Sequence, residues 1–416
     1  MLKRIIAMAA VGMLTFAPAY AADTTIELWS NRAPDPTNAR GAALKYVLDQ
    51  FESQHPGVKV NVTVLDWKEI STALMRAARA KQTPDIAMLY GPYITPHIGA
   101  GSIRVLDEYM SDDIRDSVIV LPVAQSDGNT YGLPWEVRVM GYLYRADLFE
   151  EVGVPDPQTQ DELVTALSRI KAKHGIEGYG VSFDPTRSFA AVEWFLPIAV
   201  GMGAKILNAD GSAAFNDPAV VSLLEAVHKL AHEGQAVDPT YIFVGRDDMQ
   251  QRVEGGKLSM VTGGTHGLAE MRERSGLGTK LTFAPVPGFD AEHPTPAVLQ
   301  GWNLVIPTDA EHPDLAWDLI RVWTSPEVQR YQTEHVGYMP GNRKVIGDPM
   351  LDGPEYAHIK RAFEAIERGI LEFDWPENTE LLNVVLSNMV ATVVTDKAPI
   401  AEAIAAAEKD YNTSRE

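Results

Sequence analysis

Apolar residues early in the chain follow two different periods. Residues 26–29 alternate apolar and polar side chains, which predicts a short strand that ends at Trp29. The apolar residues between 44 and 51 instead fall on one face of a helix, which Pro56-Gly57 ends. Strict alternation returns at 58–64 and predicts a strand with one buried face. A strand, a helix and a strand at this spacing form a βαβ unit, so the pattern indicates a parallel sheet.

A second helix and a third strand extend this unit. The helix is predicted at about 68–81, and the strand follows at 86–90. In open α/β sheets, ligands bind beyond the carboxyl ends of the strands. These ends place an aromatic ring beside a polar or small residue, at Trp29-Ser30, Asp66-Trp67 and Tyr90-Gly91. Their coincidence at three neighbouring ends favours a ligand site over simple packing at a domain edge.

The rest of the chain keeps this α/β character. A turn at 126–129 precedes a strand predicted at 137–144, and helices alternate with short strands from 161 to about 287. One more strand or crossing segment is predicted at 299–307. An alanine-rich helix is predicted at about 399–410.

The first 22 residues have the pattern of a signal peptide. A short basic stretch precedes the apolar run from Ile5 to Phe16, and Ala19-Tyr20-Ala21 places small residues where a signal peptidase cuts. The alternative is a membrane anchor, which needs about 18 or more apolar residues. Pro18 and the polar residues after 22 end the run too early for an anchor. We therefore expect an exported protein.

The chain contains no cysteine. This excludes a disulfide framework, a thiol nucleophile and any cysteine-ligated metal. It also excludes the lipid-modified cysteine that tethers many exported bacterial proteins. We therefore expect a free, soluble protein in the periplasm of a Gram-negative bacterium.

An excess of acidic residues, 56 against 36 basic ones, gives a net charge of −20. This charge disfavours binding to nucleic acid or to anionic lipid. Apolar residues form 45% of the chain, and 416 residues exceed one ordinary core, so two domains are predicted. Because no flexible linker separates them, the two domains must be joined in another way.

The sequence lacks the common catalytic motifs H-E-x-x-H, G-x-S-x-G and the P-loop. Its ten histidines are interpreted as having no paired metal spacing, so we expect neither a metal nor a cofactor. The glycine-rich segment 263–267 lacks the P-loop lysine and is interpreted as a tight turn. A secreted carbohydrate hydrolase or lyase is the alternative from another class. Asp66 and Glu136 would then supply the two carboxyl groups that a glycosidase needs.

Eight segments in order along the chain resemble the extracellular solute-binding proteins of ABC importers, in the carbohydrate-binding group that includes maltose-binding protein. They are Phe51–Val60, Thr83–Ile86, Tyr131–Trp135, Tyr144–Phe149, Thr159–Leu163, Gly255–Met260, Gly301–Ile306 and Ser325–Gln329. The sequence departs from the family pattern at Arg145, where asparagine is common, and at Gln160, which replaces a tryptophan. Residues 263–266 also lack the tryptophan often found after the glycine, where a sugar often stacks.

This resemblance implies an α/β fold of two lobes, each a mixed sheet flanked by helices, with the ligand in the cleft between them. Lobe one is expected at 23–132 plus 290–338, and lobe two at 135–288 plus 342–416. Short chain crossings would form the hinge that closes on the ligand. The resemblance further implies a monomer that catalyses nothing. It would deliver a small solute, a carbohydrate, to the transmembrane permease subunits of an ABC importer.

Sugar binding needs flat apolar surfaces for the ring and polar groups in its plane for the hydroxyls. The candidate ligand contacts are Trp29, Asp66, Tyr90, Trp135, Glu136, Gly264, Thr265, Trp302, Asn303 and Arg343. Trp302 and Asn303 lead this set because the resemblance places them on a crossing. For Trp135 the alternative is packing within the hinge, and for Arg343 it is an ion pair at the surface or between the lobes.

The chemical class of the ligand stays open at this stage. A guanidinium facing the cleft at Arg343 would bind an acidic group in two places at once. Together with His266, it leaves a charged sugar derivative open, whereas the missing tryptophan argues against a simple neutral hexose or disaccharide. A polyol or a glycerol phosphodiester is the alternative solute.

Overall fold

The computed structural model describes residues 24–185, 189–232, 239–373, 375–376 and 378–415. The predicted signal peptide lies outside these residues. The strands are β1 (Thr24–Ser30), β2 (Val58–Val64), β3 (Ile86–Tyr90), β4 (Gln125–Ser126), β5 (Asn129–Thr130), β6 (Leu133–Arg145), β7 (Glu177–Gly180), β8 (Leu258–Gly264), β9 (Leu281–Pro285) and β10 (Leu299–Val305).

The α-helices are α1 (Ala39–Gln54), α2 (Glu69–Ala80), α3 (Ile94–Gly99), α4 (Asp112–Ser117), α5 (Ala146–Glu151), α6 (Gln160–His174), α7 (Leu196–Gly201), α8 (Pro218–His232), α9 (Arg246–Glu254), α10 (Leu268–Ser275), α11 (Pro313–Trp323), α12 (Pro326–Val336), α13 (Arg343–Ile346), α14 (Ala357–Arg368), α15 (Thr379–Val394) and α16 (Ile400–Ser414). Short 3₁₀ turns include η1 (Gly91–Tyr93) and η5 (Thr265–Gly267), and a π-helical turn, η3 (Ala191–Phe195), leads into α7.

One sheet runs through the whole molecule in the order β2-β1-β3-β10-β6-β8-β7, with β9 paired to the far half of β6. Strand β1 is parallel to β2 and β3, which confirms the predicted parallel βαβ unit. Strand β10 is antiparallel to both β3 and β6, so the sheet as a whole is mixed. Strands β6 and β10 therefore stand between the N-terminal strands β1–β3 and the strands β7–β9. We call β6 and β10 the crossing strands.

Local sequence explains the first elements well. Asn38 caps α1 by accepting a hydrogen bond of 2.8 Å from the backbone N–H of Gly41. The helix then buries the apolar face predicted between 44 and 51, including Phe51. Strands β2 and β3 have the predicted bounds, and the continuous apolar run of β3 is buried throughout. In β2 the predicted buried face is only partly formed, because Val58 is buried whereas Val64 is exposed.

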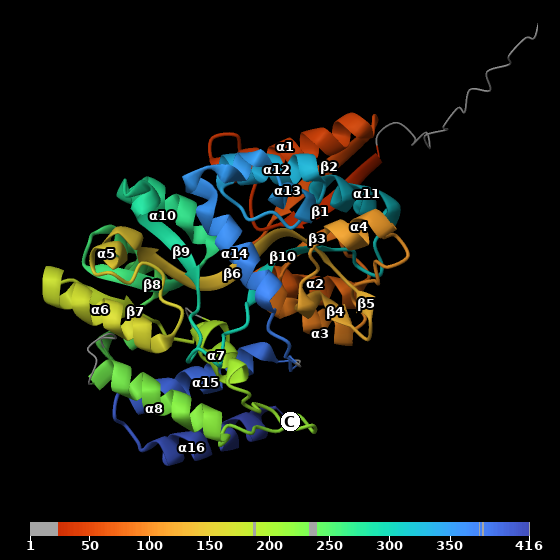
Figure 1. The fold of residues 1–416 in the computed structure, drawn as a ribbon. Helices are drawn as coiled ribbons and strands as arrows, with labels where there is room; N and C mark the ends of the chain where they lie inside the picture. Colours follow the sequence, from red (N-terminus) through yellow and green to blue (C-terminus); the bar gives the residue numbers. More distant parts are fainter. Residues whose placement is uncertain (1–23, 186–188, 233–238, 374, 377, 416) are drawn as a thin grey trace, which may run out of the picture.

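The helices gather into two lobes on either side of the crossing strands (Figure 1). The first lobe holds β1–β3 with α1–α4, α11 and α12, and its core includes Leu28, Phe51 and Trp323. The second holds β7–β9 with α5–α8, α10, α15 and α16, and its core includes Trp194 and Tyr411. Among the described residues, no helix is long and apolar enough to cross a membrane.

Strand β6 is long enough to belong to both lobes. It runs over 133–145, whereas the sequence predicted 137–144. Its first half pairs with β10, and its second half pairs with β8 and β9. The register shifts between Trp302 and Asn303, so the ladder is bulged opposite Trp135. A further apolar cluster, which includes Val139 and Phe363, packs beside this crossing.

Candidate functional site

Three of the predicted site residues lie in a row across the crossing. Trp302 on β10 stands opposite Tyr90 on β3 and opposite Glu136 on β6. Residues directly opposite each other in a sheet point to the same face, so these three side chains share one surface. The same surface carries Gln300 and Arg138, which are paired one step further along the ladder.

An aromatic cluster covers this surface and consists of Trp67, Tyr90, Tyr93, Phe189 and Trp302. Tyr90 lies at its centre, with ring centroids 5.5 Å from Trp302, 5.9 Å from Trp67 and 6.5 Å from Phe189. The Tyr90 hydroxyl donates a hydrogen bond to Gln300 Oε1. Phe189 packs against the core of the second lobe, whereas the other rings pack against that of the first. The cluster therefore closes across the junction between the lobes.

Two buried ion pairs stand beside the aromatic cluster. Arg138 donates to both carboxylate oxygens of Glu136, at 3.1 and 2.9 Å, and Glu136 is fully buried. On α9, Arg246 donates a hydrogen bond from Nη2 to Oε2 of Glu193, and Glu193 sits in the π-helical turn η3. Such turns are frequent at functional sites. The guanidinium of Arg138 also lies 5.7 Å from the centre of the Tyr90 ring, within cation–π range.

These charges act on the titratable groups around them. Burial raises the pKa of Tyr90, and Glu193 adds to the rise, so its hydroxyl stays protonated and able to donate. Burial opposes the charged form of Arg138, but Glu136 and Tyr90 outweigh it and raise the pKa of Arg138. The pKa of His266 is held well below its ordinary value by burial and by Arg138, Arg246 and Arg40. His266 is therefore a neutral imidazole at physiological pH.

The end of β8 adds polar atoms without partners. Thr265 is fully buried, and within the described residues neither its hydroxyl nor Nδ1 of His266 has a hydrogen-bond partner. Gly264 precedes them, and a Cβ atom there would lie 2.7 Å from His266 Nδ1 and 2.9 Å from Met140 Sδ, so a side chain at this position would displace one of these two side chains. Buried polar atoms normally find a partner. Those at Thr265 and His266 are therefore candidates for hydrogen bonds to a ligand or to water.

A cavity of about 500 Å³ opens between the lobes next to the aromatic cluster. Tyr93 and Pro96 of the first lobe line one side of it, and Phe189, Asn378 and Glu380 line the other. Its volume lies within the range of small-molecule sites, about 300–1,000 Å³. It reaches the aromatic cluster through Tyr93 and Phe189.

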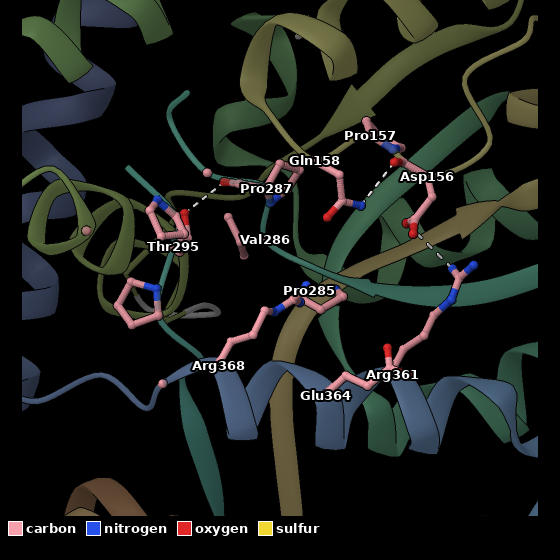
Figure 2. A pocket seen from close by; sticks show the side chains of 15 residues that line it. Asp156, Pro157, Gln158, Pro285, Val286, Pro287, Thr295, Arg361, Glu364 and Arg368 are labelled. Carbon is pink, nitrogen blue, oxygen red and sulfur yellow. Dashed lines mark hydrogen bonds and ion pairs between the residues drawn. The ribbon is translucent and has the colours of Figure 1, made fainter. Parts of the chain in front are cut away.

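A second cavity of about 500 Å³ lies within the second lobe, between α14 and two proline-rich segments (Figure 2). Arg361 approaches Asp156 across it at 3.8 Å, and Thr295 donates to the carbonyl of Pro287 at 2.8 Å. Prolines and charged side chains form much of its lining, and none of the described residues that line it is aromatic. It contains none of the predicted site residues and offers no flat aromatic surface.

The structure leaves three of the predicted residues away from the aromatic cluster. Asp66 is exposed and accepts a hydrogen bond of 2.9 Å from the backbone of Lys68, as a turn residue before α2. Arg343 makes an exposed ion pair of 3.0 Å with Glu367, so the surface ion pair foreseen as its alternative is the arrangement present. Trp29 packs against the core of the first lobe, opposite Ala87, and its register places it on the other face of the sheet from Tyr90.

Trp135 and Asn303 lie at the bulge, and both side chains are buried. The Trp135 ring contacts Trp323 and Tyr338, with centroids 5.7 and 5.6 Å apart, and Arg32 stacks over it at 5.0 Å. Such packing is what the alternative for Trp135, a role within the hinge, predicts. Asn303 is fully buried opposite Leu89, and its amide atoms have no partner among the described residues.

Sequence reasoning missed much of the site. Arg138 carried a signal, because it lies two residues after Glu136 and alternation puts both on one face of a strand. Trp67 also carried a signal, because it directly follows Asp66, a candidate ligand contact at a predicted strand end. Glu193 and Arg246 gave no local signal, since they come from separate helical segments that only the tertiary fold brings together.

The interpretation of the histidines was wrong. His228 and His232 are four residues apart on α8, a spacing that brings two side chains to one helix face. Their rings lie 4.3 Å apart, and Asp396 contacts both.

Comparisons with known proteins agree with this architecture. Residues 47–358 match the family described as bacterial extracellular solute-binding protein. A putative binding protein of Brucella abortus is 24% identical over 308 residues, which cover 73% of this chain and 74% of that one. The maltotriose-binding protein of Pyrococcus abyssi is 22% identical over 78% of this chain and 68% of its own length.

Solved structures share the two-lobed fold. An ABC transporter solute-binding protein of Thermotoga lettingae, bound to α-D-tagatose, superposes with a TM-score of 0.76 and 24% identity, covering 95% of this chain and all of that one. The family match spans most of the chain. The chain therefore belongs to the bacterial extracellular solute-binding protein family.

Proposed function

We propose that this chain captures a neutral carbohydrate between its lobes and delivers it to the permease subunits of an ABC importer. The observation that carries the proposal is the lobe junction, where aromatic rings stand beside two buried ion pairs and unpartnered polar atoms. A sugar presents apolar C–H faces to rings and hydroxyls to charged or polar groups. Tyr90 and Trp302 would supply the apolar surface, and Thr265, His266 and Glu136 the hydrogen bonds.

The charge balance of the site supports a neutral ligand. Each guanidinium at the aromatic cluster, Arg138 and Arg246, already faces one carboxylate, and His266 is uncharged. An anionic ligand would compete with Glu136 and Glu193 in a buried setting, where unpaired charge costs several kcal/mol. Arg32 has no carboxylate partner among the described residues, but its guanidinium is held by Trp135 and the Tyr338 hydroxyl.

Known relatives point to the same class of ligand. The Pyrococcus abyssi relative is a maltotriose-binding protein, and the Thermotoga lettingae structure holds tagatose. The signal-peptide pattern supports export. We further propose the periplasm as the working compartment and a monomer as the working form. The proposed hinge lies at the crossings between lobe one, 23–132 plus 290–338, and lobe two, 135–288 plus 342–416.

Binding without catalysis is part of this proposal. A glycosidase would need two carboxyl groups about one bond. Glu136 is held by Arg138, and the exposed Asp66 serves a turn instead of facing Glu136. Prolonged incubation with each binding sugar is expected to return it unchanged, as judged by chromatography, and release of any product would contradict this part.

Thermal shift with the mature chain tests the ligand class. A ligand that binds only the folded state raises the melting temperature by mass action. Neutral mono- and oligosaccharides are expected to raise it, and matched sugar acids, sugar phosphates, polyols and glycerol phosphodiesters are not. If only acidic ligands act, the charge argument fails, and Arg32 becomes the group to substitute. If only polyols or phosphodiesters act, the carbohydrate assignment is wrong.

Two variants test the position of the site by calorimetry with the sugar that responds. Trp302→Ala and Phe189→Ala remove rings from opposite lobes, and each is expected to weaken binding at least about tenfold, or 1.4 kcal/mol. Phe189 is only partly buried, so its variant keeps the test available if loss of the central Trp302 impairs folding. Trp29→Ala is the matched control and is expected to bind normally. An equal loss of sugar affinity in all three variants would show that the sugar does not bind at the aromatic cluster.

A further inference from the structure

A group of metal-ligating side chains lies outside the lobe junction, on the outer helices of the second lobe. His228 and His232 occupy successive turns at the end of α8, and Asp396 lies in the turn between α15 and α16. Asp396 has a left-handed backbone with φ of 53°. This conformation is uncommon for a residue other than glycine, and here it accompanies a carboxylate that meets both histidine rings.

The distances within this group are short. His228 Nε2 lies 2.7 Å from Asp396 Oδ1, and His232 Nε2 lies 3.4 Å from Asp396 Oδ2. One nitrogen or oxygen atom from each of the three residues falls within 4.8 Å of the others. The side chains are 38%, 33% and 64% exposed, respectively, so an ion can reach them from solvent.

We propose that His228, His232 and Asp396 form a surface site for a divalent transition-metal ion, with Zn²⁺ as the reference ion. Two imidazole nitrogens and one carboxylate are a common ligand set for Zn²⁺, and water completes the coordination. The nitrogen ligands favour Cu²⁺, Ni²⁺ and Zn²⁺ over Mn²⁺, and they disfavour Mg²⁺ and Ca²⁺, which prefer oxygen.

Only small movements are needed for an ion to enter. A tetrahedral ion with bonds of about 2.0–2.1 Å holds its ligand atoms roughly 3.3 Å apart. The hydrogen bond between His228 and Asp396 would give way to two metal bonds. His232 Nε2 also lies 2.9 Å from the carbonyl oxygen of Val394, and it would exchange this hydrogen bond for the metal. The bound ion would tie α8 to the α15–α16 turn.

Titration of the mature chain with ZnCl₂ tests this site. The protein is prepared without a histidine tag, stripped with a chelator and followed by calorimetry and by the visible absorption of Co²⁺. One saturable ion per chain is expected, together with a higher melting temperature. His228→Gln and His232→Gln are each expected to weaken binding at least tenfold, and Asp396→Asn is expected to weaken it less.

His293→Gln is the matched control, because His293 also contacts an aspartate, Asp290, at 2.8 Å but has no second histidine beside it. This variant is expected to bind as the parent does. Absence of saturable binding in the parent chain would overturn the proposal. Binding that survives loss of both His228 and His232 would overturn it as well, because the ion would then lie elsewhere. The unliganded melting temperatures of the variants separate metal loss from misfolding.

Discussion

Arg138 makes several interactions at the lobe junction at once. Its guanidinium holds both oxygens of the fully buried Glu136 and lies over the ring of Tyr90. A carboxylate that loses its partner inside a protein is far more costly than the pair is stabilising. Arg138 therefore serves the stability of the first lobe's edge and the electrostatics of the site together.

Substitution of this arginine alone is expected to be severe. Arg138→Met should lower the free energy of unfolding by about 3–5 kcal/mol, because Glu136 stays buried without its partner. The double variant Glu136→Gln with Arg138→Met should lose clearly less, since no unpaired charge remains. Urea unfolding followed by tryptophan fluorescence measures both. Strictly additive losses in the two single variants and the double variant would contradict this account.

His97 is the residue whose protonation should couple stability to pH. It is fully buried, and its ring nitrogens lie 2.7 Å from Ser102 Oγ and 3.1 Å from Ser71 Oγ. Burial lowers its pKa to about 4. Burial also lowers the pKa of His358 to about 4. Both rings therefore stay neutral in the folded chain at pH values where an unfolded histidine takes up a proton.

The sign of the pH dependence follows from this difference. Below the ordinary histidine pKa of about 6.5, the unfolded chain binds more protons, so stability falls as the pH is lowered. His97 alone should account for about 1–2 kcal/mol between pH 6.5 and 5. His97→Asn should flatten the plot of unfolding free energy against pH. The slope should fall by an amount that corresponds to at most one proton taken up on unfolding. The exposed His335→Asn serves as control, and an unchanged slope in His97→Asn would contradict the assignment.

At the scale of elements, the strands themselves could be predicted from the sequence, but the pairing of the crossing strands could not. Strands β2 and β3 were predictable residue by residue because their apolar patterns are local. The placement of β10 between β3 and β6 depends on segments far apart in the sequence, so the local pattern could not predict it. This placement brings Tyr90, Trp302 and Glu136 into one row. The family resemblance, and not the hydrophobic pattern, is what drew attention to Trp302.

Two of the predicted ligand contacts stand apart from the aromatic cluster for physical reasons. Asp66 follows a strand end, as a ligand contact would, but its short carboxylate binds the backbone of Lys68 to start α2. Trp135 adjoins Glu136 in sequence, yet it lies at the bulge and its ring packs against Trp323 instead of joining the aromatic cluster. A single strand does not reveal its own bulge, because the register shift depends on its partner.

Gly301 makes the close pairing of β10 with β6 possible. Its φ is 150°, and a Cβ atom there would collide with the carbonyl oxygen of Glu136. Gly301→Ala is therefore expected to lower the free energy of unfolding by about 3 kcal/mol or more, from backbone strain and steric overlap. Gly347→Ala is the control, because its φ is −83° and no atom lies within 4 Å of the added carbon. Similar chemical denaturation midpoints for the two variants would contradict the role of Gly301.

At the scale of the whole molecule, the lobes meet at more than the aromatic cluster. Arg40 on α1 of the first lobe and Glu270 on α10 of the second form an ion pair of 2.7 Å. Tyr90 and Phe189 meet across the same junction. These contacts join the lobes across the junction, and a hinged protein binds its ligand more weakly when its binding-competent arrangement is less populated.

Charge reversal at the ion pair should open the molecule without touching the site. Glu270→Arg places two guanidinium groups face to face, and an exposed pair of this kind contributes about 0.2–1 kcal/mol. We expect sugar affinity to fall about two- to fivefold. The radius of gyration of the unliganded chain, measured by small-angle X-ray scattering, should rise and return to the parent value with saturating sugar. Asp49→Arg reverses one side of the Lys45–Asp49 pair within α1 and should leave both quantities unchanged. If Glu270→Arg kept the parent's affinity and radius, the closed state would rest on the aromatic contacts alone.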